Sequence, residues 1–515
     1  MPENPTQLSP AERTFLKSIA SLIYCNPFSS TRKEIEEDIL KTAYLSPSGD
    51  HEGKFDNVST IQGILKTQLY ETLKHIESSR SPLPQPDFEL YEQGVWFYVF
   101  HKYANDFDQY IRKAHLRGNG RTRAPFLIRL WDDLDRFLQP IGVPQQATLH
   151  NEHLIAVFFQ VRRAFYHIHQ SIFGNSEQTR ALRARTWESI FTHNFYRYQT
   201  RLYERMGDII TLITGPSGTG KELIARAIGL SRFIPYDPTT ALFEEDFLVS
   251  FFPLNLSALS ETLIESELFG HRKGAFTGAQ TEKKGYFESC GVHGTVFLDE
   301  IGETNTSIQV KLLRVLQTRQ FQRLGGTDTL QFEGKVITAT NRNLEEEIKK
   351  GNFREDFFFR ICSDQLETSG LREILQEKPD ELPNLVSFIA KRLLGEGSIS
   401  EQLTDEAVDW IRKEVPPSYP WPGNFRELEQ CVRNIMVHGE YKIKKELVFK
   451  NAIQDGPNLP DYVEDFLKGN LSYESLLHHY FKISVNREGG FAQSARAIGV
   501  DQRTVKKYYE LKLEK

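Results

Sequence analysis

The chain has 515 residues, more than one hydrophobic core usually serves, and this length predicts about three domains. Apolar residues make up 39% and charged residues 26%, values typical of globular proteins that exclude a largely disordered chain. The net charge of -6 excludes a protein that is basic throughout, so any contact with nucleic acid must come from a local basic face. The four cysteines are scattered, which argues against a disulfide framework or a zinc site and favours a reducing cytosol.

Residues 1–170 predict a mostly helical domain, because apolar and aromatic residues recur at helical spacing over 94–115 and 154–173. The first residues lack the basic start and apolar run of a signal peptide, and no apolar stretch is long enough to cross a bilayer. We therefore expect a cytoplasmic protein that does not contact membranes. The acidic cluster after a first strand and the later phosphoacceptor Asp of a phosphorelay receiver are missing, so we do not expect phosphorelay control. The resemblance described below implies that this domain is a regulatory or sensory domain, of unknown type.

Two features of this domain leave alternatives open. The basic, glycine-rich loop 116–125 (LRGNGRTRAP) predicts a solvated turn, with a phosphate-bearing effector as the alternative ligand. The aromatic run at Trp96, Phe97, Tyr98 and Phe100 predicts core packing, with an effector pocket as the alternative. The histidines in this part of the chain have no convincing metal-ligand spacing.

Residues 171–370 change to an alternation of short apolar runs and helical segments. The runs DIITLITG, GTVFLDE and GKVITATN are typical of buried parallel strands, so we predict a three-layer α/β domain. Residues 371–451 return to a helical pattern and predict a helical lid. Residues 452–470 predict a linker because glycine, proline and asparagine are frequent there, and 471–515 predict a small helical unit.

A phosphate-binding loop is the strongest local motif. It follows a predicted strand and precedes a predicted helix, as a Walker A loop must, so that backbone N–H groups and the helix N-terminus face the phosphates. Lys221 would reach the β and γ phosphates, and Glu222 stands where the general motif has Ser or Thr. The residues of this predicted ATP site are Gly215, Pro216, Ser217, Gly218, Thr219, Gly220, Lys221 and Glu222.

Polar residues that a nucleotide motor needs follow at the ends of later strands. Asp299 would hold Mg²⁺, and Glu300 would orient and deprotonate the attacking water. Thr340 and Asn341 end another strand, where they could sense the γ-phosphate. Arg354 and Arg360 are candidate arginine fingers for the ATP of a neighbouring subunit, because the guanidinium fork matches phosphate oxygens. A surface ion pair with Glu355 or Asp356 is the alternative for these arginines.

With these motifs in place, the chain resembles the sigma-54-dependent bacterial enhancer-binding proteins, the NtrC-type AAA+ activators. The resemblance covers about 172–437 and resumes at the C-terminus. Its most diagnostic element is the GAFTGA loop, whose Phe276 and Thr277 match the family's sigma-54 contact positions. The loop comprises Gly274, Ala275, Phe276, Thr277, Gly278 and Ala279. Its two glycines suit a loop that must move and expose an aromatic ring.

The resemblance implies further roles. Asn255 matches the family's glutamate-switch residue, expected to restrain Glu300, and Arg426 in WPGNFREL matches the sensor II residue. The family's LPPLRER segment is degraded to ETSGLREI (367–374), which puts the lid connection in doubt. Extra residues at 193–207 and 233–251 flank the expected adenine pocket. A hexameric ring assembled from dimers is implied by the resemblance, as is the client, sigma-54 RNA polymerase holoenzyme.

The C-terminal residues predict a helix-turn-helix. A tight turn at 498–500 precedes a second helix capped by Asp501, with Ala492, Ala495 and Ile498 expected to face Val505 and Tyr509. From Arg487 onward seven Lys/Arg stand against four Asp/Glu, the local basic reversal that DNA binding requires. The segment resembles a Fis-type domain; a helical oligomerisation hairpin is the alternative. The residues expected to meet double-stranded DNA are Gln502, Arg503, Thr504, Lys506 and Lys507.

The leading interpretation is an ATPase that binds enhancer-like DNA and remodels the sigma-54 promoter complex, with ATP and Mg²⁺ as cofactors. A regulator that acts without sigma-54 is the first alternative, and the intact GAFTGA loop argues against it. A non-transcriptional AAA+ remodeller is the second. A metabolic P-loop kinase is the weakest, because such enzymes need neither arginines from a neighbour nor a lid of this type.

Overall fold

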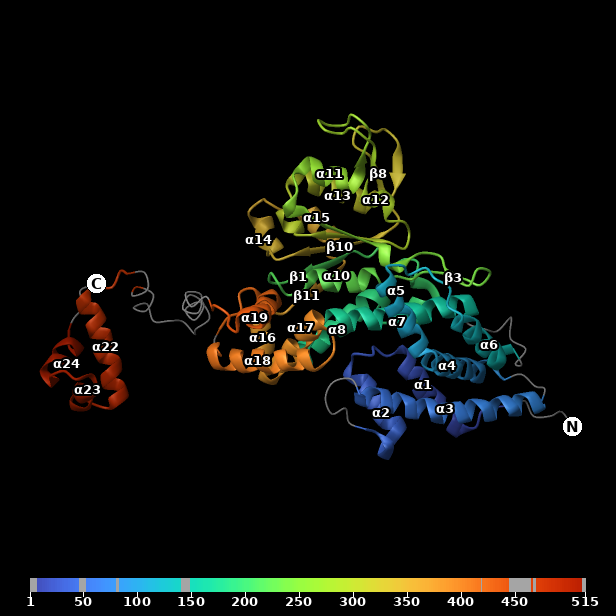
Figure 1. The fold of residues 1–515 in the computed structure, drawn as a ribbon, viewed down its shortest axis with the longest axis horizontal. Coiled ribbons are helices and arrows are strands. Elements are labelled where there is room, and N and C mark those ends of the chain that lie inside the picture. Colours follow the sequence, from blue (N-terminus) through green and yellow to red (C-terminus); the bar gives the residue numbers. More distant parts are fainter. Residues whose placement is uncertain are drawn as a thin grey trace. The chain divides into compact units, whose positions relative to one another are not determined.

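The computed structural model describes residues 7–45, 52–79, 83–139, 149–417, 419–443, 465 and 469–511. The chain divides into two compact units, residues 1–410 with 421–441 and residues 411–420 with 442–515 (Figure 1). The predicted linker at 452–470 lies mostly outside the described residues. Within the described part, the helices are all too short or too polar to span a membrane.

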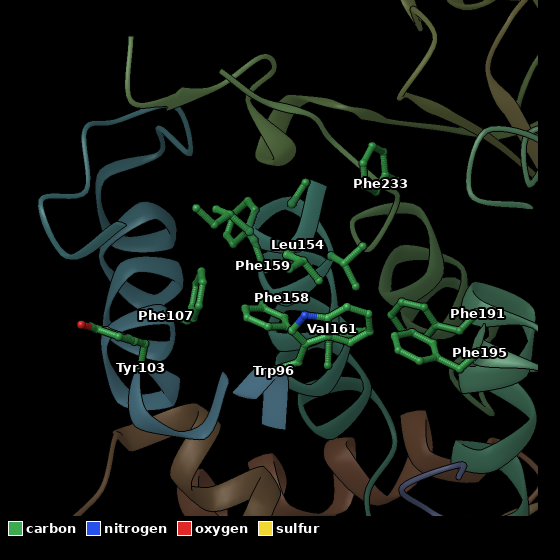
Figure 2. Close-up of a cluster of buried hydrophobic side chains, with 14 of the residues drawn as sticks. Trp96, Tyr103, Phe107, Leu154, Phe158, Phe159, Val161, Phe191, Phe195 and Phe233 are labelled. Carbon is green, nitrogen blue, oxygen red and sulfur yellow. The ribbon is translucent and has the colours of Figure 1, made fainter. Parts of the chain in front are cut away.

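The N-terminal region is helical, as predicted. Its helices are α1 (Pro10–Tyr24), α2 (Ser30–Leu40), α3 (Glu52–Ser79), α4 (Gln85–Lys102), α5 (Ala104–Arg117), α6 (Phe126–Leu138), α7 (Asn151–Ser171) and α8 (Glu177–Phe191). Trp96, Phe97 and Tyr98 on α4 are buried, which confirms core packing for them. Figure 2 shows Trp96 among the rings and aliphatic side chains of this core.

A parallel sheet of the central domain carries the predicted strands. Its order is β11 (Asp364–Glu367), β1 (Thr211–Thr214), β10 (Lys335–Thr340), β7 (Thr295–Asp299) and β4 (Phe251–Asn255). All four strand pairs are parallel, so the carboxyl ends of the strands share one edge of the sheet. The helices of this domain are α10 (Lys221–Gly229), α11 (Glu261–Phe269), α12 (Tyr286–Ser289), α13 (Thr306–Thr318), α14 (Leu344–Lys349) and α15 (Glu355–Ile361).

The two faces of this sheet serve two different cores. Leu212, Val296 and Val336 belong to one core, which includes apolar residues of α11, α13 and α15. Their strand neighbours Ile213 and Phe297 belong to the other. Side chains alternate between the faces of a strand, so this arrangement makes the three layers predicted from the alternation of strands and helices.

The second core is continuous with that of the N-terminal helices. On α7, Phe159 stacks on Phe243 of the inserted segment 233–251, with ring centroids 4.0 Å apart. Arg163 is fully buried and donates to the carbonyls of Leu230, 2.9 Å away, and Arg232, 2.6 Å away, just beyond the end of α10. These contacts supply donors for carbonyls that a helix end leaves unpaired. The insertion therefore joins the N-terminal helices to the nucleotide-binding domain.

The basic loop 116–125 is not the solvated turn we expected. Gly120 is buried, and its N–H donates to Asp246 Oδ1 at 2.9 Å. The Arg121 Nε–H donates to the Phe243 carbonyl at 3.1 Å, in the same insertion. A side chain at position 120 would collide with Asp246 and Phe247, so the glycine permits close packing of the loop. The composition did not reveal this contact because the partner lies over 120 residues further along the chain.

The lid is helical, as predicted, and comprises α16 (Leu371–Glu377), α17 (Leu382–Leu394), α18 (Ser398–Glu414) and α19 (Asn424–His438). Two of its carboxylates bind the start of α8. Glu377 Oε1 accepts from the Glu177 N–H at 2.6 Å, and Glu381 Oε1 accepts from the Asn175 N–H at 2.8 Å. Negative charge is favourable at a helix N-terminus, so these contacts fasten the lid to α8.

The C-terminal unit contains α22 (Tyr473–Glu488), α23 (Phe491–Ile498) and α24 (Gln502–Tyr509). Its own small core includes Phe481, Val485, Ala495 and Val505. The turn after α23 and the Asp501 cap are as predicted, with Asp501 Oδ1 accepting from the Arg503 N–H at 2.8 Å. The prediction that Ala492 faces Val505 is wrong, since Ala492 is exposed. Ser494 is buried instead and shares a 2.7 Å hydrogen bond with Ser484 on α22.

Candidate functional site

The phosphate-binding loop joins β1 to α10 at the carboxyl edge of the sheet. Gly215 and Gly218 have φ of 137° and 80°, a region that favours glycine. At Gly218 a Cβ atom would lie 2.2 Å from the Gly423 carbonyl oxygen of the lid. Gly220 precedes α10, and the exposed Glu222 lies in its first turn. The predicted Walker A residues thus form a bare backbone loop at a helix N-terminus, an arrangement suited to phosphate.

Lys221 is buried at the start of α10, and its Nζ donates to the carbonyls of Gly215 at 2.9 Å and Pro216 at 3.0 Å. Burial lowers the pKa of this amine, while the nearby Glu300 and Asp299 carboxylates oppose that shift. The ammonium group is thus held inside the loop, where it can neutralise phosphate oxygens.

Two acidic residues stand at the end of β7, as predicted: Asp299 is its last residue and Glu300 follows it. Burial raises the pKa of Asp299, and burial together with Asp299 raises the pKa of Glu300. Glu300 has φ of 56°, which is strained for a residue with a Cβ atom. Its Oε2 is buried and has no hydrogen-bond partner among the residues that the structure describes. Such an orphaned acceptor beside a second carboxylate and Lys221 fits a nucleotide with its magnesium ion and an attacking water.

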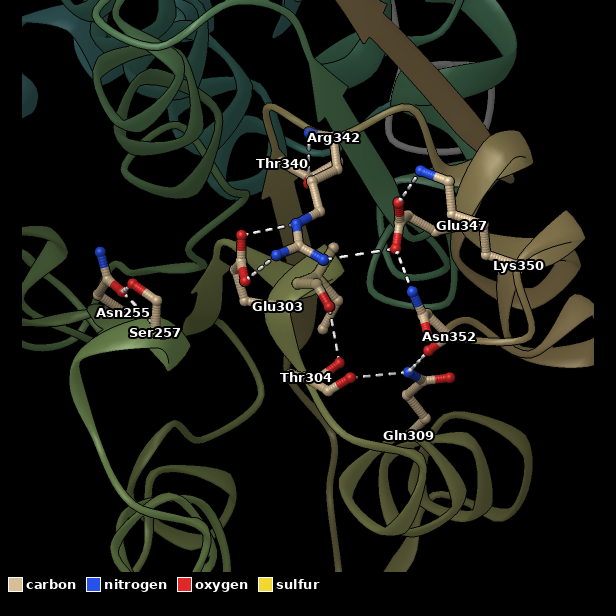
Figure 3. Close-up of polar contacts among 11 residues, drawn as sticks. Asn255, Ser257, Glu303, Thr304, Gln309, Thr340, Arg342, Glu347, Lys350 and Asn352 are labelled. Atoms are coloured by element: carbon tan, nitrogen blue, oxygen red, sulfur yellow. Dashed lines mark hydrogen bonds and ion pairs between the residues drawn. The ribbon is translucent and has the colours of Figure 1, made fainter.

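Asn255 ends β4 in register with Asp299 on β7. Its Oδ1 accepts from the Ser257 N–H at 3.0 Å and the Ser257 hydroxyl at 2.8 Å, which caps a short turn (Figure 3). This side-chain oxygen is thus engaged with Ser257 rather than with Glu300. The glutamate-switch role of Asn255 stays a prediction.

The strand β10 ends at the buried Thr340, whose Oγ1 accepts from the Arg342 N–H at 3.1 Å, and Asn341 is exposed beside it. Sequence reasoning missed Arg342. It forms ion pairs with Glu303, which lies three residues after Glu300, and with Glu347 on α14 (Figure 3). No local motif signals this bridge, because Glu303 lies 39 residues before Arg342 in the sequence.

Further hydrogen bonds extend from this bridge to the predicted finger Arg354. The Asn352 side chain donates to Glu347 at 2.8 Å, and the Asn352 carbonyl accepts from Gln309 Nε2 at 3.0 Å (Figure 3). Gln309 Oε1 accepts from the Arg354 N–H at 2.9 Å. Gln309 is fully buried on α13. A continuous polar network therefore connects the strand ends of the nucleotide site to the backbone of Arg354.

The two candidate arginine fingers differ in their surroundings. Arg354 is exposed and forms a bidentate ion pair with Asp356, at 3.0 and 2.7 Å. This is the surface ion pair that we gave as the alternative to a finger role. Arg360 is half-buried and donates to the Leu316 carbonyl, 3.0 Å from its Nε. An exposed ion pair is weak and exchangeable, so Arg354 is the more available of the two for a neighbouring subunit.

The lid contacts the phosphate-binding loop through residues that the sequence analysis did not single out. Asn424 Nδ2 donates to the Ser217 carbonyl at 2.9 Å, and its Oδ1 accepts from the Leu371 N–H at 2.9 Å. In the degraded segment 367–374, Thr368 shares a 2.6 Å hydroxyl hydrogen bond with Thr219. The lid is therefore connected to the phosphate-binding loop through Asn424, which lies in WPGNFREL, and through Thr368 of the degraded segment. Arg426 on α19 is exposed, and its Cβ lies 3.3 Å from where a Gly218 Cβ would be.

The GAFTGA loop is carried by a short hairpin that follows α11 directly, with strands β5 (Gly270–His271) and β6 (Lys283–Lys284). Gly274 and Gly278 have positive φ, and a side chain on either would meet no atom within 4 Å. Thr277 is exposed. Phe276 is half-buried rather than exposed as we expected, because its ring packs on His271 with centroids 5.0 Å apart.

A second hairpin lies against the base of this loop, with strands β8 (Gln320–Gln322) and β9 (Thr329–Gln331). Its Leu324 N–H donates to the Gly270 carbonyl at 3.0 Å, and its carbonyl accepts from the Arg272 N–H at 3.0 Å. Arg323 forms ion pairs with Glu282 and Glu288. The loop is thus braced at its base and open at its tip.

The five-stranded parallel order, the phosphate-binding loop on β1 and the paired acids on β7 define a P-loop domain of the AAA+ class. Residues 194–367 match the family model described as the Sigma-54 interaction domain. This region of the chain is therefore a sigma-54 interaction domain with an AAA+ fold.

Several curated regulators are similar to the chain over this region. They include the Nif-specific regulatory protein of Enterobacter agglomerans, 41% identical over 259 residues, which are 49% of this chain and 46% of that protein. The transcriptional regulatory protein ZraR of Klebsiella oxytoca is 35% identical over 306 residues, 58% of this chain and 62% of that protein. The DNA-binding transcriptional regulator NtrC of Rhizobium meliloti (strain 1021) is 35% identical over 294 residues, 56% and 55% of the two chains. The chain thus spans about half the length of the curated relatives it matches.

Among solved structures, NtrX from Brucella abortus in complex with ATP superposes with a TM-score of 0.38 and 23% identity, over 70% of this chain and 75% of that chain. A score this low describes a loose overall superposition.

Proposed function

We propose that this protein is a transcriptional activator that binds upstream DNA and uses ATP hydrolysis to remodel the sigma-54 RNA polymerase promoter complex. The observation that carries the proposal is the exposed Thr277 in a glycine-bearing loop, which α11 connects to the strand ends of the nucleotide site. The match of residues 194–367 to the sigma-54 interaction domain supports sigma-54 as the client.

In this proposal the chain's own residues position the phosphates and the water. Lys221 and the N–H groups of the loop would bind phosphate oxygens, and Arg426 of the lid, whose Cβ lies beside Gly218, would add positive charge. Asp299 would hold a magnesium ion, which would supply positive charge to the phosphates. Glu300 orients the attacking water and accepts its proton, a role suited to a carboxylate with an unpaired buried oxygen.

Movement would pass from the nucleotide site to the loop through α11. Asn255 and Asp299 lie in register at the strand ends, and α11 follows that segment and leads straight into β5. Glu265 on α11 forms an ion pair with Lys311 on α13, which ties the helix to the rest of this layer. A change in the strand ends on γ-phosphate loss can therefore displace α11 and the loop as a unit.

The proposal includes assembly, as a hexameric ring built from dimers, with Arg354 and Arg360 reaching the nucleotide of the next subunit. The exposure of Arg354 and its link to the strand ends support this role. The C-terminal unit would bind double-stranded DNA through Gln502, Arg503, Thr504, Lys506 and Lys507. Gln502, Arg503, Lys506 and Lys507 are exposed on α24, as predicted.

The test is to measure ATP turnover and melting of a sigma-54 promoter on the same preparations. Wild-type protein should do both, and Lys221→Ala should do neither because it loses phosphate binding. Thr277→Ala should hydrolyse ATP at close to the wild-type rate but should not melt the promoter. Thr240→Ala, a change at another exposed threonine in the turn of the insertion, is the matched control and should behave as wild type.

Promoter melting by Thr277→Ala at the wild-type level would contradict the assignment of the loop. Loss of ATP turnover in Thr277→Ala would mean that the loop belongs to the hydrolytic site rather than to a client surface.

A further inference from the structure

A large crevice lies between the N-terminal helices and the lid. Its volume is about 2480 Å³, and its walls come from α1, α2, α3, α4, α5, α7 and α8 on one side and from α17 on the other. This volume exceeds that of ordinary small-molecule sites, which hold roughly 300–1,000 Å³. The crevice is separate from the phosphate-binding loop, although it touches Leu223 on α10.

The walls of the crevice are net basic. Eleven Lys/Arg and five Asp/Glu line it, and two of the lysines, Lys33 and Lys102, pair with Glu37 and Asp133 beside it, which leaves an excess of about four positive charges on a chain whose net charge is -6. Concentrated charge of one sign in a concave surface with apolar walls raises the local concentration of ions of the opposite sign. An occupant of this crevice should therefore be an anion.

Two arginines from different helices, Arg32 on α2 and Arg162 on α7, line the crevice. Arg32 gives its Nε–H to Glu36 at 2.8 Å, and Arg162 gives its Nε–H at 3.0 Å and a second N–H to Asp108. A guanidinium has five N–H donors, so these carboxylates leave donors available to a ligand.

Aromatic rings surround the two arginines. The Arg162 guanidinium lies over the Phe100 ring at 5.8 Å and over the Phe165 ring at 5.9 Å. Phe165 in turn packs against Trp187, with ring centroids 5.2 Å apart. Stacked guanidinium and aromatic groups offer flat apolar surface beside fixed positive charge. A ligand with a planar ring and one acidic group would match both the aromatic surface and the positive charge.

We propose that this crevice is a binding site for a small aromatic anion, which is a planar ring system carrying a phosphate, carboxylate or sulfonate. The acidic group binds near Arg32 and Arg162, and the ring lies among Phe100, Phe165 and Trp187. The site is independent of the proposed function, because it uses neither the phosphate-binding loop nor the GAFTGA loop. The crevice is also lined by Lys391 and Arg392 of the lid.

The experiment titrates the full-length protein with anilinonaphthalene sulfonate and follows the fluorescence of the dye. Saturable binding at one dye per chain is expected. Arg32→Ala and Arg162→Ala should each weaken it by about tenfold, the loss expected for one charge-assisted hydrogen bond. Arg129→Ala, which removes an exposed helical arginine also paired with an aspartate, is the matched control and should bind the dye normally. Phenylnaphthylamine, the same rings without the sulfonate, should bind more weakly and equally to all variants.

Two further arms keep the test decisive. Arg162→Lys keeps the charge opposite Asp108 and should retain the fold and bind the dye with an intermediate affinity. Lys221→Ala should bind it as wild type does, which separates this site from the nucleotide site.

Displacement of the dye by adenosine monophosphate or by benzoate would distinguish a nucleotide from an aryl carboxylate as the natural class. Displacement by neither at millimolar concentration, equal binding of the neutral dye, or indifference to both arginine substitutions would overturn the proposal.

Discussion

Glu300 is the residue at which stability and function conflict most clearly. Its backbone is strained, its Oε2 is buried without a partner among the described residues, and its pKa is raised by burial and by Asp299. A buried acceptor without a partner costs about 1–3 kcal/mol. This cost is consistent with a site shaped for a water molecule and a phosphate rather than for the empty protein.

Replacing Glu300 with glutamine should therefore stabilise the protein and abolish turnover. ATP hydrolysis should fall by about 100-fold or more, the usual contribution of a general base. The thermal midpoint should rise at neutral pH, because the glutamine carries no buried charge. Glu222→Gln, which changes an exposed glutamate in the first turn of α10, is the control and should raise neither the midpoint nor its pH dependence.

The pH dependence of that stabilisation follows from the raised pKa. In the unfolded chain Glu300 ionises near the ordinary value of about 4.3, and in the folded protein it ionises at higher pH. The penalty is thus absent below the unfolded value and complete above the folded one. The difference in thermal midpoint between Glu300→Gln and wild type should be larger at about pH 7.5 than at about pH 4.5. An equal difference at both values would contradict this account.

Individual residues of the site were predictable where a local motif specifies them. The Walker loop, Asp299 and Glu300 follow from strand-then-helix patterns, and the structure brings them together. Arg342, Asn424 and Thr368 were missed because each acts through a partner that is distant in the sequence. A pattern within one segment carries no information about such partners. The half-buried state of Phe276 was missed although its partner His271 is only five residues away, because the spacing does not show how the loop folds back.

At the scale of elements, the polar network through Gln309 connects the nucleotide-binding strand ends to the finger loop. Gln309→Leu keeps the volume but removes the hydrogen bonds to Thr304, Asn352 and Arg354. We expect ATP affinity to be nearly unchanged and ATP turnover to fall at least tenfold, because the backbone of Arg354 loses its anchor. The readouts are equilibrium binding of a fluorescent ATP analogue and steady-state phosphate release.

Gln160→Leu supplies the matched control for that substitution. Gln160 is also a buried glutamine, and it donates to the Ser231 carbonyl at 2.9 Å, away from the finger loop. Both substitutions should lower the thermal midpoint by a similar amount, since each leaves buried polar groups unpaired. Equal losses of turnover in the two variants would show that Gln309 acts only on stability.

DNA binding through the helix α24 can be tested by its salt dependence. If it lies on DNA, replacing both Lys506 and Lys507 with alanine should reduce the slope of log affinity against log salt by about 2, one for each lost phosphate contact. Lys482→Ala on α22 removes an exposed lysine from the same unit and should leave the slope unchanged. The measurement is fluorescence anisotropy with duplex DNA at several salt concentrations. An unaltered slope in the double variant would favour the oligomerisation hairpin instead.

At the scale of the whole molecule, the N-terminal helices and the nucleotide-binding domain share one core. Composition and periodicity predicted the fold class of each region, the strands and the lid. They did not predict that the two regions share a core. The insertion 233–251 joins them, but its sequence is typical of an extra loop. Phe243 and Phe247 lie in that insertion and pack against α7. The change of pattern near residue 170 is therefore not a division between cores.

This shared core makes a prediction about truncation. Removing residues 1–170 should expose the apolar surface around Phe243 and Phe247 and lower the solubility and thermal midpoint of the remainder. Removing residues 469–515 should leave the thermal midpoint of the rest unchanged, because the C-terminal unit has a separate core. Differential scanning fluorimetry on the two deletions checks this. A soluble N-terminal deletion with the wild-type midpoint would contradict the shared core.

The most direct test of the central claim is whether the full-length protein captures sigma-54 in the presence of ADP–aluminium fluoride, which mimics the transferring phosphoryl group. Analytical size-exclusion chromatography of the mixture gives the answer. The account predicts a stable complex that forms only with the analogue and is lost in Thr277→Ala. Absence of a complex from a protein that turns over ATP would contradict sigma-54 as its client.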